Sequence, residues 1–502
     1  MLRRFGPKLI PVAIVLFWLI MMALLIRHEF LVPYLNPGTF GGAAYSDVPT
    51  ETWMGVYLPG DQPVGYVQVA TRPEPHGDEP GTRLHLNANI RMQLFGEETR
   101  VAMDGSAWTS ADRGMSEFNF GMRSGGHALR VTGAVEAGML KALVHTGGET
   151  IPIEWPVKDE LILWSGWGMT ELNMPALKPG KEYFVESFDP TTLSLGRARL
   201  ECVGQERIEL NGGQVDTKVV SIEVAGVVSK AWVADSGEVV RAETPFGFTL
   251  QRAAPEVALR NLSGEASGAL LQLAAVPVSG PTPFRGARRM VVRLGRRAGD
   301  AAPDSPQPPS DDVQHSDGDG QYTIIVPAEP AGAEAQALDA EAAREHLASG
   351  PLVQADHPRI QALAARIAPE GADPWARACA IYNWVYTSID KVPVLSLPSA
   401  LDVLDTREGD CNEHTVLFTA LARAAGIPAR IAIGVVWSED LKSFYYHAWP
   451  EVYVGQWVWM EPTLGQPVAD ATHIKLLAGD IQRWTELLPY LGQLTVEVIE
   501  IE

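Results

Sequence analysis

The stretch REGDCNEHTVLFTALARAAGIPAR, residues Arg407–Arg430, places a cysteine where a polar turn gives way to an apolar run. From residue 412 to residue 425 the apolar side chains recur at spacings of three and four, the period of an α-helix. They are Val416, Leu417, Ala420, Leu421 and Ala424. Gly426 and Pro428 follow as stop signals. The pattern predicts a helix of about four turns with Cys411 at its N-terminal end.

A thiol at that position has three candidate roles. A helix N-terminus stabilises negative charge, so it is expected to lower the pKa of Cys411 and favour the nucleophilic thiolate. Cys411 could equally be a small piece of the core. It could also bind zinc, because Cys411 and His414 form a C-x-x-H pair that His447 could complete, but a second cysteine pair at metal spacing is missing. His414 is expected to pack or to form a hydrogen bond instead.

Two polar residues downstream favour the nucleophile. His447 lies in a strand-like stretch, and Glu461 ends the next one, 461 − 447 = 14 residues later. The tight connection at Gly455-Gln456 indicates that the two strands are antiparallel neighbours. A carboxylate at the end of one strand could then reach the imidazole on the other. Cysteine, histidine and carboxylate in these positions follow the logic of a nucleophile, its base and the group that orients the base.

Residues 398–466 resemble the core of the transglutaminase-like superfamily, whose active-site arrangement is related to that of papain. Two motifs carry the resemblance, SALDVLDTREGDCNEHTVLFTALARAAGIPARIAIGV and YYHAWPEVYVGQWVWMEPTLGQ. The resemblance implies that Cys411 attacks an amide or peptide carbonyl, that His447 is its base and that Glu461 orients the histidine. It implies a protein or peptide substrate, cleaved by water or transferred to an amine, with hydrolysis slightly favoured. We predict neither a cofactor nor a metal for this site.

One residue departs from the family pattern. The family usually has aspartate before Pro-Thr, whereas this chain has Glu461 in the sequence MEPT. The extra methylene moves the carboxylate by about one bond length, and catalytic sites tolerate little misplacement. An alternative prediction is therefore a catalytically weak or inactive domain that serves as a binding scaffold.

The N-terminus predicts a membrane anchor. Residues Leu9–Ile26 form an apolar run that follows a basic segment, and no cleavage-site pattern comes after it. We expect an uncleaved signal anchor over residues 1–29, with a cleaved signal peptide as the alternative. The positive flank predicts a cytoplasmic N-terminus and the bulk of the chain outside the cytoplasmic membrane, in the periplasm. Residues 30–52 are rich in Pro and Gly without periodicity, which predicts a stalk.

The rest of the chain predicts an α+β protein with two large parts. Residues 53–294 alternate apolar and polar side chains, as in Arg83–Leu94, which predicts a large antiparallel β-rich domain of unknown role. Polar, Pro-rich residues 295–321 predict a disordered linker or loop. Residues 322–502, with helices followed by strands, predict the transglutaminase-like domain. The strand Tyr322–Val326 could pair with residues 289–294 across the linker.

Composition and charge exclude some classes of partner and of stabilising cross-link. The net charge of −21 argues against a nucleic-acid partner, because phosphate binding needs a basic surface. The three cysteines lie far apart in the sequence, which is not a disulfide framework. Cys202 and Cys379 are expected to be small core residues, and the oligomeric state is not predicted.

Overall fold

The computed structural model describes residues 49–94, 97–110, 114–158, 161–165, 168–169, 178–224, 226–244, 247–260, 274–297, 307–318, 320–327 and 338–502. The expected signal anchor at residues 1–29 and nearly all of the expected stalk at residues 30–52 lie outside these ranges. None of the helices in the described part combines the length and the hydrophobicity that a membrane crossing requires.

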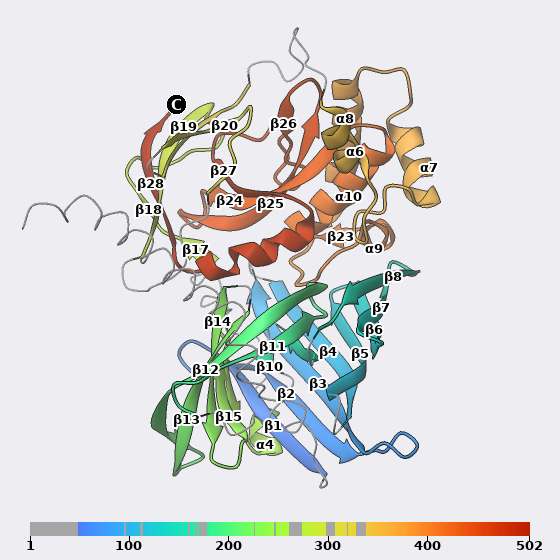
Figure 1. The fold of residues 1–502 in the computed structure, drawn as a ribbon. Helices are drawn as coiled ribbons and strands as arrows, with labels where there is room; N and C mark the ends of the chain where they lie inside the picture. Colours follow the sequence, from blue (N-terminus) through green and yellow to red (C-terminus); the bar gives the residue numbers. More distant parts are fainter. Residues whose placement is uncertain are drawn as a thin grey trace, which may run out of the picture.

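The N-terminal half forms one curved sheet of sixteen strands within the described residues (Figure 1). The strands of this β module are β1 (Thr50–Leu58), β2 (Gln62–Pro73), β3 (Gly81–Leu94), β4 (Glu97–Ser110), β5 (Gly114–Ser124), β6 (His127–Glu136), β7 (Met139–Thr146), β8 (Glu149–Pro156), β9 (Leu161–Ser165), β10 (Gly168–Met169), β11 (Glu182–Asp189), β12 (Ser194–Leu210), β13 (Gly213–Val224), β14 (Val227–Ala234), β15 (Val239–Glu243) and β16 (Thr249–Arg252). The strand order begins β10, β9, β11 and then follows the chain from β11 to β16. The strand β16 pairs with β1, and the order follows the chain again from β1 to β8. Neighbouring strands are antiparallel, except that β9 and β11 are parallel.

The strand β3 illustrates how alternation builds this sheet. Ala88, Ile90 and Met92 are buried, whereas His85 and Asn87 on the opposite face are exposed. Because side chains of a strand alternate between its two faces, every second residue faces the core. The half-buried antiparallel strand predicted from this stretch is confirmed.

In the described residues, the C-terminal domain combines helices with two five-stranded sheets and one two-stranded sheet. Its helices are α6 (Ala340–Leu347), α7 (Pro358–Ile367), α8 (Pro374–Ser388), α9 (Ala400–Thr406) and α10 (Cys411–Ala424), with a 3₁₀ helix η2 (Ile481–Tyr490), while the short α4 (Pro255–Ala258) follows the β module. The first sheet has the order β17 (Ala275–Val276), β25 (Ser443–Tyr453), β24 (Ala429–Ser438) and β27 (His473–Gly479), with β26 (Trp457–Trp459) paired to β25. The second has the order β18 (Val278–Ser279), β28 (Leu494–Ile501), β19 (Arg289–Arg296), β21 (Gln321–Ile325) and β20 (Gln314–Gly318), and β22 (Asp390–Lys391) pairs with β23 (Glu408–Gly409).

The helix α10 is the centre of this domain. It contacts α7, α8 and α9 on one side and β24 and β25 on the other. Its apolar stripe is completely buried, at Val416, Leu417, Ala420 and Leu421. The predicted helix is confirmed, and burial of its stripe fixes the position of its first residue, Cys411.

The boundary between the two parts differs from the expected one. The strand β19 pairs with β21 and β28, so residues 289–296 belong to the C-terminal domain and the β module ends near Arg252. The predicted pairing of Tyr322 with this stretch is confirmed, in the register Val292↔Tyr322.

The described part of the expected linker at 295–321 is packed rather than free. Asp311 forms an ion pair with the fully buried Lys475, and the side chain of Gln314 hydrogen-bonds the backbone of Lys475 at both its N–H and its C=O. A buried lysine needs a carboxylate partner, which explains why this polar segment is held against the domain.

The two parts meet where the ends of β6, β7 and β8 lie against α9 and β23 (Figure 1). His127, at the start of β6, binds Asp402 of α9 through Nδ1 at 2.5 Å and the backbone oxygen of Glu408 through Nε2 at 2.9 Å. The backbone N–H of Gly126 donates to the Glu408 carboxylate at 2.7 Å. The β module therefore contacts the segment that leads directly into Cys411.

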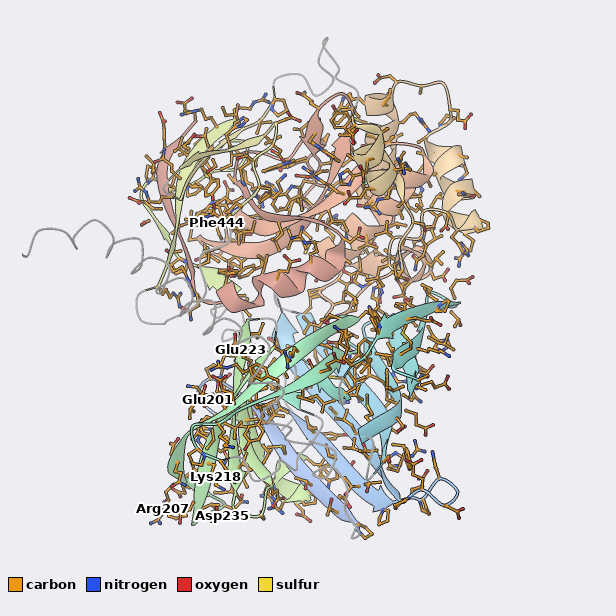
Figure 2. All side chains as sticks on the ribbon, in the orientation of Figure 1. Glu201, Arg207, Lys218, Glu223, Asp235 and Phe444 are labelled. Carbon is orange, nitrogen blue, oxygen red and sulfur yellow. The ribbon has the colours of Figure 1, made fainter. Side chains whose placement is uncertain are left out.

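The opposite end of the β module is rich in charge. Arg207, Lys218 and Asp235 lie there, remote from the C-terminal domain (Figure 2). Arg207 pairs with Asp216 at 2.6 Å, and both side chains are mostly exposed. Exposed pairs of this kind contribute little stability, so we assign this end to solvent.

Candidate active site

The local sequence fixes Cys411 at the first position of α10. Asp410 is the N-cap residue, and its carboxylate accepts a hydrogen bond from the backbone N–H of Asn412 at 3.1 Å. Glu413 completes a capping box by accepting from the N–H of Asp410 at 2.8 Å. Gly409 has a φ of 150°, and a Cβ there would lie 2.2 Å from Cγ of Glu413. Gly409 and Asp410 are therefore the residues that this helix start requires immediately before Cys411.

The ionisation of Cys411 differs from the expectation. Burial of the sulfur raises the pKa of Cys411 well above its ordinary value, and the carboxylates of Asp410 and Glu413 add to this effect. A hydrogen bond from the backbone N–H of Ala448 acts in the opposite direction. Desolvation thus opposes the helix N-terminus, and the thiolate needs a proton acceptor in order to form.

His447 and Glu461 are brought together as the strand pattern predicted. The strands β25 and β26 pair antiparallel, with Glu451 opposite Trp459, and Glu461 follows the end of β26. Nε2 of His447 lies 2.7 Å from Oε2 of Glu461. In the described part of the chain, this is the only hydrogen bond that the His447 ring makes. Nδ1 therefore has no hydrogen-bond partner among the described residues.

The Glu461 side chain is one methylene longer than the expected aspartate, and hydrogen bonds hold its carboxylate at both oxygens. Oε1 accepts hydrogen bonds from the backbone N–H groups of Thr463 at 2.8 Å and Leu464 at 2.9 Å. Burial alone would raise the pKa of Glu461, but its interactions with His447 and His473 hold this pKa well below its ordinary value. Glu461 is therefore ionised at neutral pH.

The sequence reasoning missed a second histidine on this carboxylate. Nε2 of His473, the first residue of β27, lies 3.2 Å from the same Oε2 of Glu461. Its Nδ1 lies 3.1 Å from the backbone oxygen of Asp470 and 3.5 Å from the Asp470 carboxylate. Burial would lower the pKa of His473, but the bonds to Asp470 and Glu461 raise it to about 9. The available signal was the polar stretch ADATH immediately before an apolar strand.

The central strand β24 explains how the two histidines meet. Gly434 lies opposite His447 on one side, and Val436 lies opposite His473 on the other. Paired residues share a face of a sheet, and alternate residues of one strand do too, so both imidazoles lie on one face. Gly434 has no side chain, and a Cβ there would lie 2.0 Å from the backbone oxygen of Ile474. The ring centroids of the two histidines are 6.0 Å apart.

One group of side chains in the described part of the chain could hold a metal ion. The ligand atoms of His447, Glu461 and His473 all lie within 4.8 Å of one another. This is a different set from the zinc ligands considered above, because Cys411 and His414 are not part of it. Nδ1 of the buried His414 lies 2.7 Å from the backbone oxygen of Asp410, and its Nε2 has no hydrogen-bond partner among the residues that the structure describes. Without a metal, hydrogen bonds already occupy both nitrogens of His473 and both oxygens of Glu461.

Comparison with solved structures finds distant likenesses. A protein from Cytophaga hutchinsonii described as a candidate cysteine protease has 17% identity and a TM-score of 0.28, over 45% of this chain and 85% of that one. A candidate protease from Parabacteroides distasonis has 11% identity and a TM-score of 0.21, over 70% of this chain and 68% of that one. A β-barrel-like protein of unknown function from Brucella abortus has 9% identity and a TM-score of 0.29, over 41% of this chain and 96% of that one.

The family comparison is more specific. No curated protein matches the chain. Residues 361–462 match the sequence profile described as the transglutaminase-like superfamily. This range contains Cys411, His447 and Glu461, together with the helices α8 to α10 and the strands β24 to β26. Residues 361–462 of the C-terminal domain therefore contain a core of the transglutaminase-like superfamily.

Proposed function

We propose that this chain is a cysteine enzyme that acts on amide or peptide bonds of proteins, with Cys411 as nucleophile, His447 as base and Glu461 as the residue that orients His447. The observation that carries the proposal is the state of the His447 ring. Its Nε2 is bound to a buried carboxylate whose pKa is held low, while its Nδ1 has no hydrogen-bond partner in the described part of the chain. Such a ring is held in one orientation and has one nitrogen ready to take a proton.

In the first half of the proposed reaction, Nδ1 of His447 takes the proton of the Cys411 thiol and the sulfur adds to the amide carbonyl carbon. The carbonyl π electrons move to the oxygen, where the backbone N–H of Cys411 is the expected donor. The intermediate collapses by breaking its C–N bond, and the His447 imidazolium returns the proton to the leaving amine. The products are a free amine and an acyl-thioester on Cys411.

In the second half, His447 removes a proton from water as the water oxygen adds to the thioester carbon. The C–S bond then breaks, and the proton returns to the Cys411 sulfur. The acyl group leaves as a carboxylic acid, or as a new amide if an amine replaces water. We favour water and therefore a peptidase or amidase.

The raised thiol pKa supports this order of events. Because burial disfavours the free thiolate at Cys411, proton transfer to His447 must accompany the attack on the carbonyl. The same observation favours the second candidate function, a binding scaffold in which the thiol stays protonated and inert. The two differ in whether the reactivity of Cys411 depends on His447.

The experiment offers a peptide library to the full-length chain in detergent, with and without an added primary amine. Wild type, Cys411→Ala and the control Cys379→Ala are compared, because Cys379 is a half-buried thiol outside the site. We expect new carboxyl termini with wild type and Cys379→Ala, and none with Cys411→Ala. Amine-labelled peptides in place of new carboxyl termini would assign acyl transfer, and identical peptides in all three samples would support the scaffold.

We also propose that the apolar run at residues Leu9–Ile26 anchors the chain in the cytoplasmic membrane, with the enzyme on the periplasmic side. Fractionation of cells that express the full chain should recover it with membranes. Protease added to spheroplasts should degrade it. Protection from that protease would contradict the proposed orientation.

A further inference from the structure

Glu461 is shared between two histidines, and only one of them takes part in the proposed reaction. Oε2 faces Nε2 of His447 at 2.7 Å and Nε2 of His473 at 3.2 Å. Both Glu461 and His473 are fully buried. A buried carboxylate that lost one of its donors would bear an uncompensated desolvation penalty. The bond to His473 is therefore part of what keeps Glu461 charged.

His473 is itself firmly anchored. The Asp470 carboxylate beside it accepts hydrogen bonds from the backbone N–H groups of Gly286 and Thr472, each at 2.9 Å, and from the Gln466 amide at 2.6 Å. Asp470 thus links the loop after β26 to the loop before β19. The position of His473 is set by the framework of the domain and not by substrate.

The charges around His473 make it a cation. Asp470 faces one nitrogen of the His473 ring and Glu461 the other, and the ring makes a T-shaped contact with Trp449, with centroids 5.1 Å apart. On the same strand, Lys475 is compensated by Glu451 and Asp311. When His447 is protonated, negative and positive charges therefore alternate along the row Asp470, His473, Glu461 and His447.

We propose that His473, anchored by Asp470, is a positioning residue that keeps Glu461 ionised and directed at His447. This inference rests on the proposed function and extends it. A glutamate has one more rotatable bond than the aspartate usual in this family, so its carboxylate needs more anchors to hold one orientation. His473 on Oε2 and the two backbone N–H groups on Oε1 supply them.

The test measures how fast iodoacetamide alkylates Cys411 as a function of pH, with the alkylated peptide identified by mass spectrometry. The proteins are full-length wild type, His447→Ala, His473→Asn and His473→Gln. Glutamine can still donate to Glu461 but carries no charge, whereas asparagine is too short to reach it. Thermal unfolding of each variant is recorded in parallel.

We expect alkylation of wild type to depend on His447. In His473→Asn it should be roughly tenfold to a hundredfold slower, because the carboxylate loses its orientation. The rise of its pH profile should move to higher pH by on the order of one unit, since a positive charge next to the site is lost. His473→Gln should show the same shift of the profile with a smaller loss of rate. A merely structural role would lower the thermal stability without moving the profile.

Failure of this inference differs from failure of the proposed function. If alkylation of Cys411 does not respond to His447→Ala, the proposed function is wrong. If it does respond, but both His473 variants fold and overlay the wild-type profile, only the role of His473 is wrong. Alkylation that Zn²⁺ abolishes at stoichiometric concentration and a chelator restores would also overturn the inference, because His473 would then be a metal ligand.

If neither His473 variant folds, the protonation state of His473 in the wild-type protein tests the proposal. In ¹⁵N-histidine-labelled protein at pH 7.5, with His473 assigned through its contact with Trp449, both ring nitrogens should carry protons. A neutral His473 ring with one bare nitrogen would contradict the proposal.

Discussion

Two buried histidine–carboxylate contacts of this molecule look alike and differ in one respect. At the domain interface, His127 binds Asp402 through one ring nitrogen and the backbone oxygen of Glu408 through the other. In the candidate active site, Glu461 binds His447 and His473, and the His447 ring keeps one nitrogen unpaired within the described residues. In the first contact, both nitrogens of the histidine ring have hydrogen-bond partners. The second leaves one nitrogen for chemistry.

Under the proposed function, this difference in pairing separates a docking histidine from a catalytic one more clearly than residue type does. A fully paired buried histidine contributes binding energy between two parts of a protein, and any proton it exchanged would break a contact. A histidine with one paired nitrogen is held in one orientation, and its unpaired nitrogen stays available for proton transfer. The comparison predicts that the same chemical change at the two carboxylates will have different consequences.

The largest effect is expected from Glu461→Gln. Replacing the carboxylate by an amide removes the negative charge between His447 and His473, and it can stabilise the wrong tautomer of His447. We expect the alkylation rate of Cys411, and turnover once a substrate is found, to fall roughly 10³- to 10⁴-fold. The matched control is Asp402→Asn at the interface, which should leave these rates within the same order of magnitude. Equal losses in both variants would remove the distinction between the two contacts.

The second prediction concerns stability and uses Asp402→Asn itself. His127 is almost completely covered, so an amide in place of the carboxylate leaves it with a weaker partner. We expect the free energy of unfolding to fall by about 1.5–3 kcal/mol, the range of hydrogen bonds to charged groups. Urea denaturation followed by tryptophan fluorescence measures this change. Asp405→Asn, on the same helix but in a largely exposed pair with Arg359, is the control and should change stability by less.

The sequence predicted the parts of the site that depend on neighbouring residues. The start of α10 at Cys411 follows from local capping chemistry, and the approach of His447 to Glu461 follows from one tight turn between adjacent strands. The sign of the Cys411 pKa shift was predicted wrongly, because burial of the sulfur depends on the whole domain.

The residues that the sequence did not predict depend on distant pairings. His473 reaches Glu461 because β27 lies on the far side of β24 from β25, with a change of register between Ile433 and Gly434. His127 reaches Asp402 across 275 residues of chain, through the docking of two modules. Neither arrangement leaves a periodic signal in the sequence.

A third prediction tests the interface through two adjacent glycines. Both have a positive φ, +56° at Gly147 and +77° at Gly148, so alanine is strained at either position. A Cβ on Gly147 would lie 2.6 Å from the backbone nitrogen of Asp402, whereas nothing lies within 4 Å of one on Gly148. We expect Gly147→Ala to lower the unfolding free energy by about 1–3 kcal/mol more than Gly148→Ala, which is the cost of overpacking. Equal effects would mean that this turn does not press on α9.

The smallest effect is a pH dependence of docking. Burial would lower the pKa of His127, but the hydrogen bond and charge of Asp402 outweigh this effect, and the pKa is raised. A group whose pKa is higher in the folded state stabilises that state fully below its unfolded pKa of about 6.5, and the stabilisation is lost as the pH rises through the folded value. The stability difference between wild type and His127→Gln should therefore shrink as the pH rises above neutrality.

Hydrogen exchange at the turn between β5 and β6 should report the same change locally. Its protection in wild type should fall across the pH window in which His127 loses its proton, after correction for the intrinsic pH dependence of exchange. In His127→Gln protection should be low throughout. If the stability difference between wild type and His127→Gln instead grows with pH, His127 is neutral in the folded protein. The contact between His127 and Asp402 is then an ordinary hydrogen bond and not an ion pair. His127 would then differ in charge from His473, although both nitrogens of each ring have partners.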